Sequence, residues 1–216
     1  MSVLPWDRWR ESGLWRAFLL TCREVMLRPS ATFGRMRPEG SVRGSLLFAL
    51  LSSFAGYAPI GLANVLLATV HTLDSPPTAL DEPLLLGMYG FSFAVYGVLV
   101  PAMGLVTTLF VSMGDHLVLK GLGVPSSFRA TLRGHALSQG VHLVGLVPCL
   151  GVPVFVLWCM GVRVVAYRAL YRLGWGTAAM GALLFPFLAG GLGVWGWRAW
   201  VESWSGLGDW SWLLDG

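Results

Sequence analysis

The feature that most constrains this chain is a run of 31 residues, Leu84 to Gly114, without a single Asp, Glu, Lys or Arg. Water-soluble folds rarely need such a run, whereas a bilayer requires about 20 apolar residues for each helix that crosses it. Hydrophobic residues make up 55% of the chain and charged residues 12%, against about 25% charged in soluble proteins. We therefore expect an integral membrane protein of the all-α class, built as a polytopic helical bundle.

Five apolar segments, separated by turns rich in proline, glycine or acidic residues, predict five transmembrane helices. They cover residues 45–70, 84–117, 130–148, 150–169 and 177–199. The second segment is long enough for two short passes, a re-entrant loop or one long helix that bends at Pro101. The Lys and Arg distribution favours one helix. With five spans and a cytoplasmic N-terminus, fourteen of the fifteen basic residues lie inside, and only Arg198 lies outside.

The expected organisation has three parts. Residues 1–44 form a cytoplasmic segment, residues 45–199 form the five-span membrane domain, and residues 200–216 form a Trp-rich tail outside the membrane. The tail contains four tryptophans, which is typical of an aromatic belt at a membrane surface. A multi-pass protein of a bacterial cytoplasmic membrane, with its N-terminus inside and its C-terminus outside, fits this pattern.

An amphipathic helix is expected within the first 44 residues, lying in the membrane interface. Its apolar residues recur at helical spacing: Leu14, Trp15, Phe18, Leu19, Met26 and Leu27. Arg16 and Arg23 fall elsewhere on the helical wheel and would approach anionic lipid headgroups, so Trp15, Arg16 and Arg23 are candidate lipid-interface residues. The helix should end before Pro29, and Ser30 is expected to cap a second short helix. A soluble partner-binding helix is the alternative.

The third apolar segment contains a polar stripe. His135, Gln139 and His142 share one helix face by their spacing. Polar groups inside a membrane are costly and usually face protein or water. Three interpretations stay open: hydrogen bonds between helices, a polar cavity for a substrate, lipid headgroup or proton, and a metal site. With Arg163, these residues form the candidate intramembrane polar site.

The charged residues near this site have simpler expected roles. We expect Asp115 and His116 to pair with Arg129 or Arg133 across the short loop at the membrane surface. Arg163 is expected to extend towards the interface, and a pair with Asp115 is the alternative.

The sequence contains none of the common catalytic or nucleotide-binding motifs. It has no HExxH, GxSxG or Walker-type sequence and no cysteine pair at metal-binding spacing. We therefore predict a protein that is not an enzyme, with no catalytic residues, no cofactor and no metal. The three cysteines are expected to be free thiols. The N-terminal arginines interleave with acidic and apolar residues, which favours phospholipid over nucleic acid as their partner.

Several segments in order resemble the Yip domain (Ypt/Rab-interacting protein) family, in its compact bacterial form. They are Arg28–Phe33, Met36–Gly40, Leu119–Gly123, Phe128–Arg133, Ser138–Gln139, Val147–Gly151 and Gly161–Arg163. The resemblance implies a five-span membrane domain with a cytoplasmic N-terminus. It also implies a link to Rab-type GTPases and vesicle traffic in eukaryotic members. This chain lacks their long polar N-terminal region and DLYGP-like motif, which argues against a GTPase partner.

Two functional hypotheses follow. The first is a non-enzymatic membrane protein that organises membranes or binds lipids or partner proteins, with the lipid bilayer and anionic headgroups as its contacts. The second is a small oligomeric transporter or channel subunit that uses the polar stripe of the third span. A homo- or hetero-oligomer is compatible with both.

Overall fold

The computed structural model describes residues 3–73, 87, 89–146 and 151–207, and this part of the chain is all-helical. The described residues include eight α-helices and three 3-10 or π-helical segments. In chain order they are η1 (Pro5–Arg8), α1 (Trp9–Ser12), α2 (Leu14–Leu27), α3 (Pro29–Gly34), α4 (Val42–Leu73), η2 (Ala94–Leu99), α6 (Val100–Gly121), α7 (Phe128–Ser138), η3 (Gln139–Leu146), α8 (Gly151–Tyr171) and α9 (Trp175–Leu207). The predicted all-α class is confirmed.

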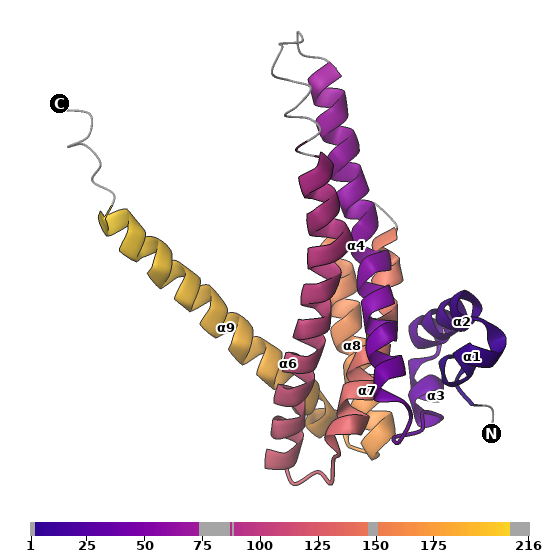
Figure 1. Cartoon of the computed structure of the whole chain (residues 1–216). Coiled ribbons are helices and arrows are strands. Elements are labelled where there is room, and N and C mark those ends of the chain that lie inside the picture. Colours follow the sequence, from indigo (N-terminus) through magenta and orange to yellow (C-terminus); the bar gives the residue numbers. More distant parts are fainter. Residues whose placement is uncertain (1–2, 74–86, 88, 147–150, 208–216) are drawn as a thin grey trace, which may run out of the picture.

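Three stretches in the described residues are long and apolar enough to cross a membrane. They are Val42–Leu67, Tyr89–Gly121 and Trp175–Arg198, with mean hydropathy of 1.7, 2.0 and 1.7. This is the pattern of a multi-pass membrane protein. Figure 1 shows α4, α6, α7 and α8 side by side, whereas α9 starts at the lower end of this bundle and runs away from it.

The second apolar segment forms one helical stretch of 33 residues, Tyr89–Gly121, as the charge distribution predicts. The stretch is not uniform, because η2 is a π-helical segment that ends two residues before Pro101. Proline has no N–H to donate to the preceding turn, which disturbs the regular hydrogen-bond ladder. A π-helical turn is one way for a helix to absorb such a disturbance.

The segment expected as the third span lies in the interior of the bundle, and the fourth packs against it. The third is α-helical through Ser138 and continues as the 3-10 segment η3, and α8 packs against both. Every residue from 130 to 141 is buried by neighbouring helices. Protein rather than lipid therefore surrounds this helix, which is why it can carry a polar stripe.

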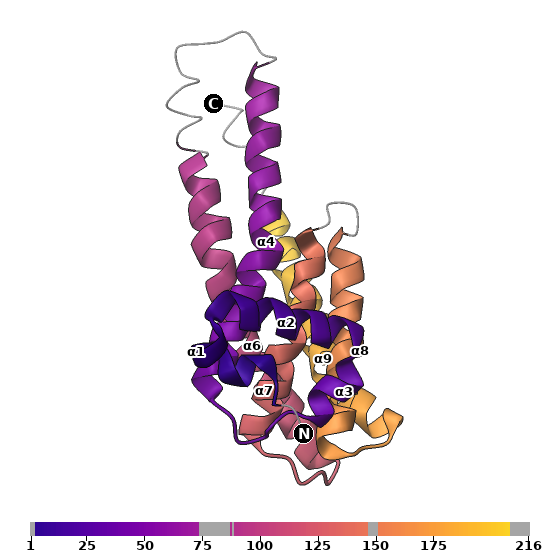
Figure 2. The ribbon, with the colours of Figure 1, turned by 90° about the vertical axis from the view of Figure 1, so that its right-hand side faces the viewer.

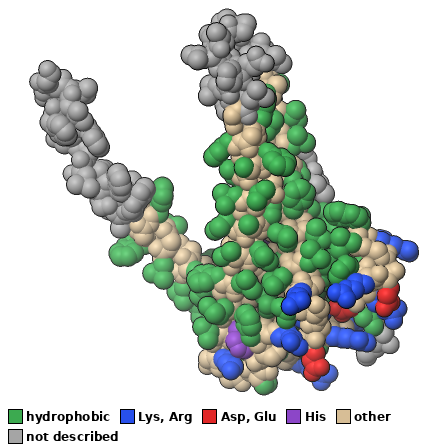
Figure 3. Space-filling view, in the orientation of Figure 1, with side chains coloured by type: hydrophobic (Ala, Val, Ile, Leu, Met, Phe, Trp, Pro, Cys, Tyr) green, Lys and Arg blue, Asp and Glu red, His purple; other side chains and the backbone are tan. Residues whose placement is uncertain are grey.

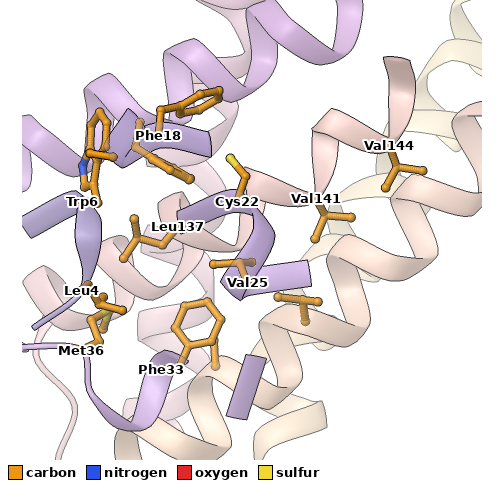
Figure 4. Packing of buried hydrophobic residues seen from close by; sticks show 14 residues of the cluster. Leu4, Trp6, Phe18, Cys22, Val25, Phe33, Met36, Leu137, Val141 and Val144 are labelled. Atoms are coloured by element: carbon orange, nitrogen blue, oxygen red, sulfur yellow. The ribbon is translucent and has the colours of Figure 1, made fainter. Parts of the chain in front are cut away.

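The N-terminal helices pack on the side of the bundle, where α2 runs across it (Figure 2). One side of α2 joins the hydrophobic core of the protein, with Phe18, Cys22 and Val25 buried against Leu137 and Val141 (Figure 4). Trp6 is also buried here and donates a hydrogen bond from Nε1 to the carbonyl oxygen of Gly44 (2.8 Å). Residues from both sides of the predicted boundary at residue 44 thus share one core.

The predicted apolar stripe of α2 is partly wrong. Phe18 is only 2% exposed and faces the core, whereas Trp15, Leu19 and Leu27 are 62%, 54% and 66% exposed. The helix ends before Pro29, as expected, but Pro29 rather than Ser30 starts the next helix. The apolar stripe was misassigned because helical spacing identifies an apolar side of a helix but does not show whether protein or lipid covers that side.

Candidate functional site: a polar cavity in the helix bundle

The four residues of the predicted polar site line one cavity of about 490 Å³. His135 comes from α7, Gln139 and His142 come from η3, and Arg163 comes from α8. The volume lies within the range of about 300–1,000 Å³ usual for small-molecule sites. The structure therefore brings together all four residues that the helical spacing and the charge pattern singled out.

The other residues that line the cavity are of two kinds, polar and apolar. Ser53, Tyr57, Thr107 and Cys159 add polar or thiol groups to the four site residues. The apolar walls are formed by Leu99, Val100, Met103, Val111, Met160 and Pro186. The cavity thus combines hydrogen-bonding groups with a hydrocarbon-like surface, which suits a ligand that has both characters.

The cavity reaches the outer surface of the protein at η2 and α6. Leu99 and Met103 line it and are each 53% exposed on the surface of the protein. Pro186 of α9 also lines the cavity. A ligand dissolved in the membrane interior could therefore reach the polar groups without passing through water.

Beside the cavity lies a buried charged cluster, which we define as Asp115, His135, Arg163 and Tyr167. Asp115 of α6 is its centre and has no solvent-exposed surface. The Tyr167 hydroxyl donates to Asp115 Oδ2 (2.7 Å), and Arg163 Nε lies 3.6 Å from the same oxygen. Arg163 also donates to the backbone carbonyl of Ala182. The cluster therefore connects α6, α7, α8 and α9.

The geometry of this cluster fixes the expected proton position on His135. An Arg163 N–H can only donate, and its Nη1 lies 3.2 Å from His135 Nδ1. The separation of His135 Nδ1 from Asp115 Oδ2 is 3.6 Å, too long for a hydrogen bond. His135 Nδ1 is therefore the acceptor, and the ring proton is on Nε2.

The expected surface pairing of Asp115 is wrong. Asp115 is paired with Arg163 inside the bundle, which was the alternative, and Arg163 is itself only 6% exposed. His116 instead lies 3.2 Å from the hydroxyl of Ser126. The reason is helix phase, because Asp115 continues the inward face of α6 that begins with Thr108 and Ser112.

Arg133, expected at the membrane surface as a partner of Asp115 or His116, is instead buried and paired with the N-terminal segment. It is 1% exposed and donates to Asp7 (2.9 Å), to the backbone carbonyl of Ser41 (3.0 Å) and to the hydroxyl of Ser45 (3.2 Å). This arginine attaches the N-terminal segment to the centre of the bundle. No local pattern signals it, because its partner Asp7 is 126 positions away.

Gln139 links the third segment to α6 through one of its side-chain polar atoms, and the other has no hydrogen-bond partner in the described part of the chain. Its Nε2 donates to the hydroxyl of Thr108. Its Oε1, like Ser53 Oγ, is buried and has no hydrogen-bond partner within the described residues. Buried polar atoms are nearly always hydrogen-bonded, so these two atoms are positions where a ligand group would be stabilised.

The other candidate residues have simple surroundings. Trp15, Arg16 and Arg23 all lie exposed on α2. Cys22 and Cys159 are free thiols, and Cys149 lies outside the described residues. The side chains of the predicted aromatic tail also lie outside them. In the described part of the chain, no three His, Cys, Asp or Glu side chains are close enough to hold a metal ion.

The cavity and the charged cluster beside it can provide hydrogen bonds and charge pairing to a ligand. The geometry points to recognition of an amphipathic ligand. Comparisons with protein-family models, curated proteins and solved structures find no match for the chain.

Proposed function

We propose that this chain is a non-enzymatic multi-pass membrane protein that binds an amphipathic, lipid-like molecule in its bundle cavity. The polar head of the ligand would hydrogen-bond to Gln139 and its neighbours. Its apolar part would lie along Leu99 and Met103. The observation that carries the proposal is that one cavity has both a polar end and an apolar opening onto the protein surface.

The proposed topology has five spans, with the N-terminus in the cytoplasm of a bacterial cell and the C-terminus outside. The two spans beyond the three long apolar stretches would be α7 with η3, and α8. The distribution of basic residues supports this orientation, and so does the resemblance to the Yip domain family. A role in membrane organisation or lipid binding fits this topology, whereas a GTPase partner is not part of the proposal.

Native mass spectrometry of the full chain, purified in mild detergent, tests the proposal. The wild type is expected to retain a defined amphipathic molecule at about one copy per chain. Met103→Trp should lower its retention, because the larger side chain reduces the volume of the cavity. Gln139→Leu should do the same, because it removes the polar contact.

Val106→Trp is the matched control for Met103→Trp. Val106 lies on the same helix and is 56% exposed, but it does not line the cavity. Equal loss of the molecule in both variants, or none retained by the wild type, would contradict the proposal.

Transport of the same class of molecule is the second candidate function. The π-helical segment η2 favours it, because this segment contributes Leu99 to the cavity and π-helical turns are frequent at functional sites. Irregular helices at polar sites are common in transporters. Movement of a fluorescent lipid analogue between leaflets of reconstituted vesicles, lost in Gln139→Leu, would separate transport from binding alone.

A further inference from the structure

A second hollow, separate from the bundle cavity, lies between α2 and α3. Its volume is about 420 Å³, and six residues that define its chemistry are Leu20, Arg23, Glu24, Leu27, Arg28 and Arg35. We call it the α2–α3 groove. It contains three arginines and one glutamate, so its side chains carry a net positive charge of two.

The arginines of this groove are held in different ways. Arg35 is paired with Glu24 at 2.7 Å and also donates from Nε to the carbonyl oxygen of Ala31 (3.1 Å). This pair connects α2 to α3 and fixes one wall of the groove. Arg23 and Arg28 lie exposed on the same groove and extend the positive charge beyond the pair.

Apolar surface adjoins these charges. Leu20 is 38% exposed and Leu27 is 66% exposed, and both line the groove. Figure 3 shows basic side chains over the N-terminal helices and along the lower end of the bundle, below the largely hydrophobic surface of the long helices. A free anion would use the arginines and leave the leucines exposed to water, whereas a phospholipid would use both.

We infer that the α2–α3 groove binds the headgroup phosphate of an anionic phospholipid, with the start of an acyl chain against Leu20 and Leu27. Arginine is suited to phosphate, because its planar N–H groups can contact two oxygens at once. The inference rests on the proposed membrane function but uses a different site from the cavity. It names the class of lipid and the residues that select it.

Lipid titration of the full chain in detergent, followed by native mass spectrometry, tests the inference. The probes are phosphatidylglycerol, phosphatidylcholine and inorganic phosphate. The wild type should bind phosphatidylglycerol more tightly than phosphatidylcholine, and phosphate at equal concentration should not displace it. Arg23→Ala with Arg28→Ala should weaken phosphatidylglycerol binding by about fivefold for each arginine, while phosphatidylcholine binding changes little.

Arg129→Ala is the matched control, since Arg129 is exposed and does not line the groove. It should leave phosphatidylglycerol binding within about twofold of wild type, because screening weakens interactions between distant exposed charges. Glu24→Gln should act in the opposite direction and tighten binding several-fold, because it removes the only negative charge in the groove while the glutamine oxygen can still accept the hydrogen bond from Arg35. This variant also carries the test if the double arginine variant does not purify in folded form.

Three results would overturn the inference. They are equal affinity for the two lipids, displacement of phosphatidylglycerol by inorganic phosphate, and no gain in affinity for Glu24→Gln. The Met103→Trp variant separates the two sites, because it should leave phosphatidylglycerol binding unchanged. If the wild type retains no molecule in the cavity but still selects the anionic headgroup, only the cavity proposal is contradicted. If it retains the cavity molecule but does not select the headgroup, only the groove inference is contradicted.

Discussion

Asp115 is the residue on which the interior of the bundle depends most. It is fully buried, accepts a hydrogen bond from Tyr167 and compensates the charge of Arg163. Removing one member of a buried ion pair leaves the other charge without compensation. Asp115 therefore joins α6 to α8, so its removal should destabilise the packing of these two helices as well as the cavity wall.

Asp115→Ala should destabilise the protein by about 3–5 kcal/mol, because Arg163 would remain buried without its counter-charge. Replacing both residues, Asp115→Leu with Arg163→Leu, should restore much of the loss. Unfolding in denaturing detergent, followed by tryptophan fluorescence, measures both effects. Exposed Glu39→Ala is the control and should change stability by less than about 0.5 kcal/mol. A double variant no more stable than Asp115→Ala would show that the pair is not coupled.

The two described cysteines should differ sharply in reactivity. Cys159 lines the cavity, whereas Cys22 has no exposed surface, and burial raises the pKa of the Cys22 thiol. A maleimide must reach the sulfur atom, so complete burial protects Cys22, whereas Cys159 is partly exposed. In a Cys149→Ser background, a membrane-permeant maleimide should label Cys159 and not Cys22, as mass spectrometry of peptides would show. Faster labelling of Cys22 would mean that α2 does not pack on the bundle as described.

At the scale of helices, close approach depends on a few glycines. A Cβ atom at Gly114 of α6 would overlap the ring of Phe185 in α9, whereas one at Gly190 of α9 would meet nothing within 4 Å. Gly114→Ala should therefore lower the stability by about 1–3 kcal/mol through overpacking, and Gly190→Ala should not. Thermal unfolding in detergent compares them. Equal stability of the two variants would show that α6 and α9 do not pack closely at Gly114.

The helices themselves were largely readable from the sequence. Apolar runs and Pro and Gly punctuation located the long helices, and the charge distribution favoured a single helix over the segment that contains Pro101. The polar site was also readable in part, since helical spacing placed His135, Gln139 and His142 on one face and the structure puts them around one cavity.

Contacts between distant elements could not be read in the same way. Spacing within a helix shows which residues share a face but not which element covers that face. The sequence therefore did not show that Phe18 and Trp6 lie in the protein core and not in lipid. For the same reason it did not show that Arg133 pairs with Asp7. Asp115 was assigned to the surface because it ends a charge-free run, whereas its helix phase points it inward.

For the whole molecule, the helix directions place the α6–α7 and α8–α9 connections at the same end of the bundle. α6 ends, and α7 begins, at the lower end of the bundle in Figure 1, where α8 ends and α9 begins. The N-terminal helices are on the same part of the molecule (Figure 2). In the proposed topology this end lies in the cytoplasm, where basic residues are most common.

Single cysteines placed in a background without native cysteines test this topology. Ser12, Pro125 and Gly174 are exposed and lie in the N-terminal segment, the α6–α7 turn and the α8–α9 turn. Substituted by Cys, all three should react with a membrane-impermeant maleimide only when the cytoplasmic face is open, as in inverted vesicles. A tag at the C-terminus should be reached only from the opposite face, because five crossings place the two ends on different sides. A C-terminal tag on the same side as Pro125→Cys would mean an even number of crossings and would remove the five-span topology.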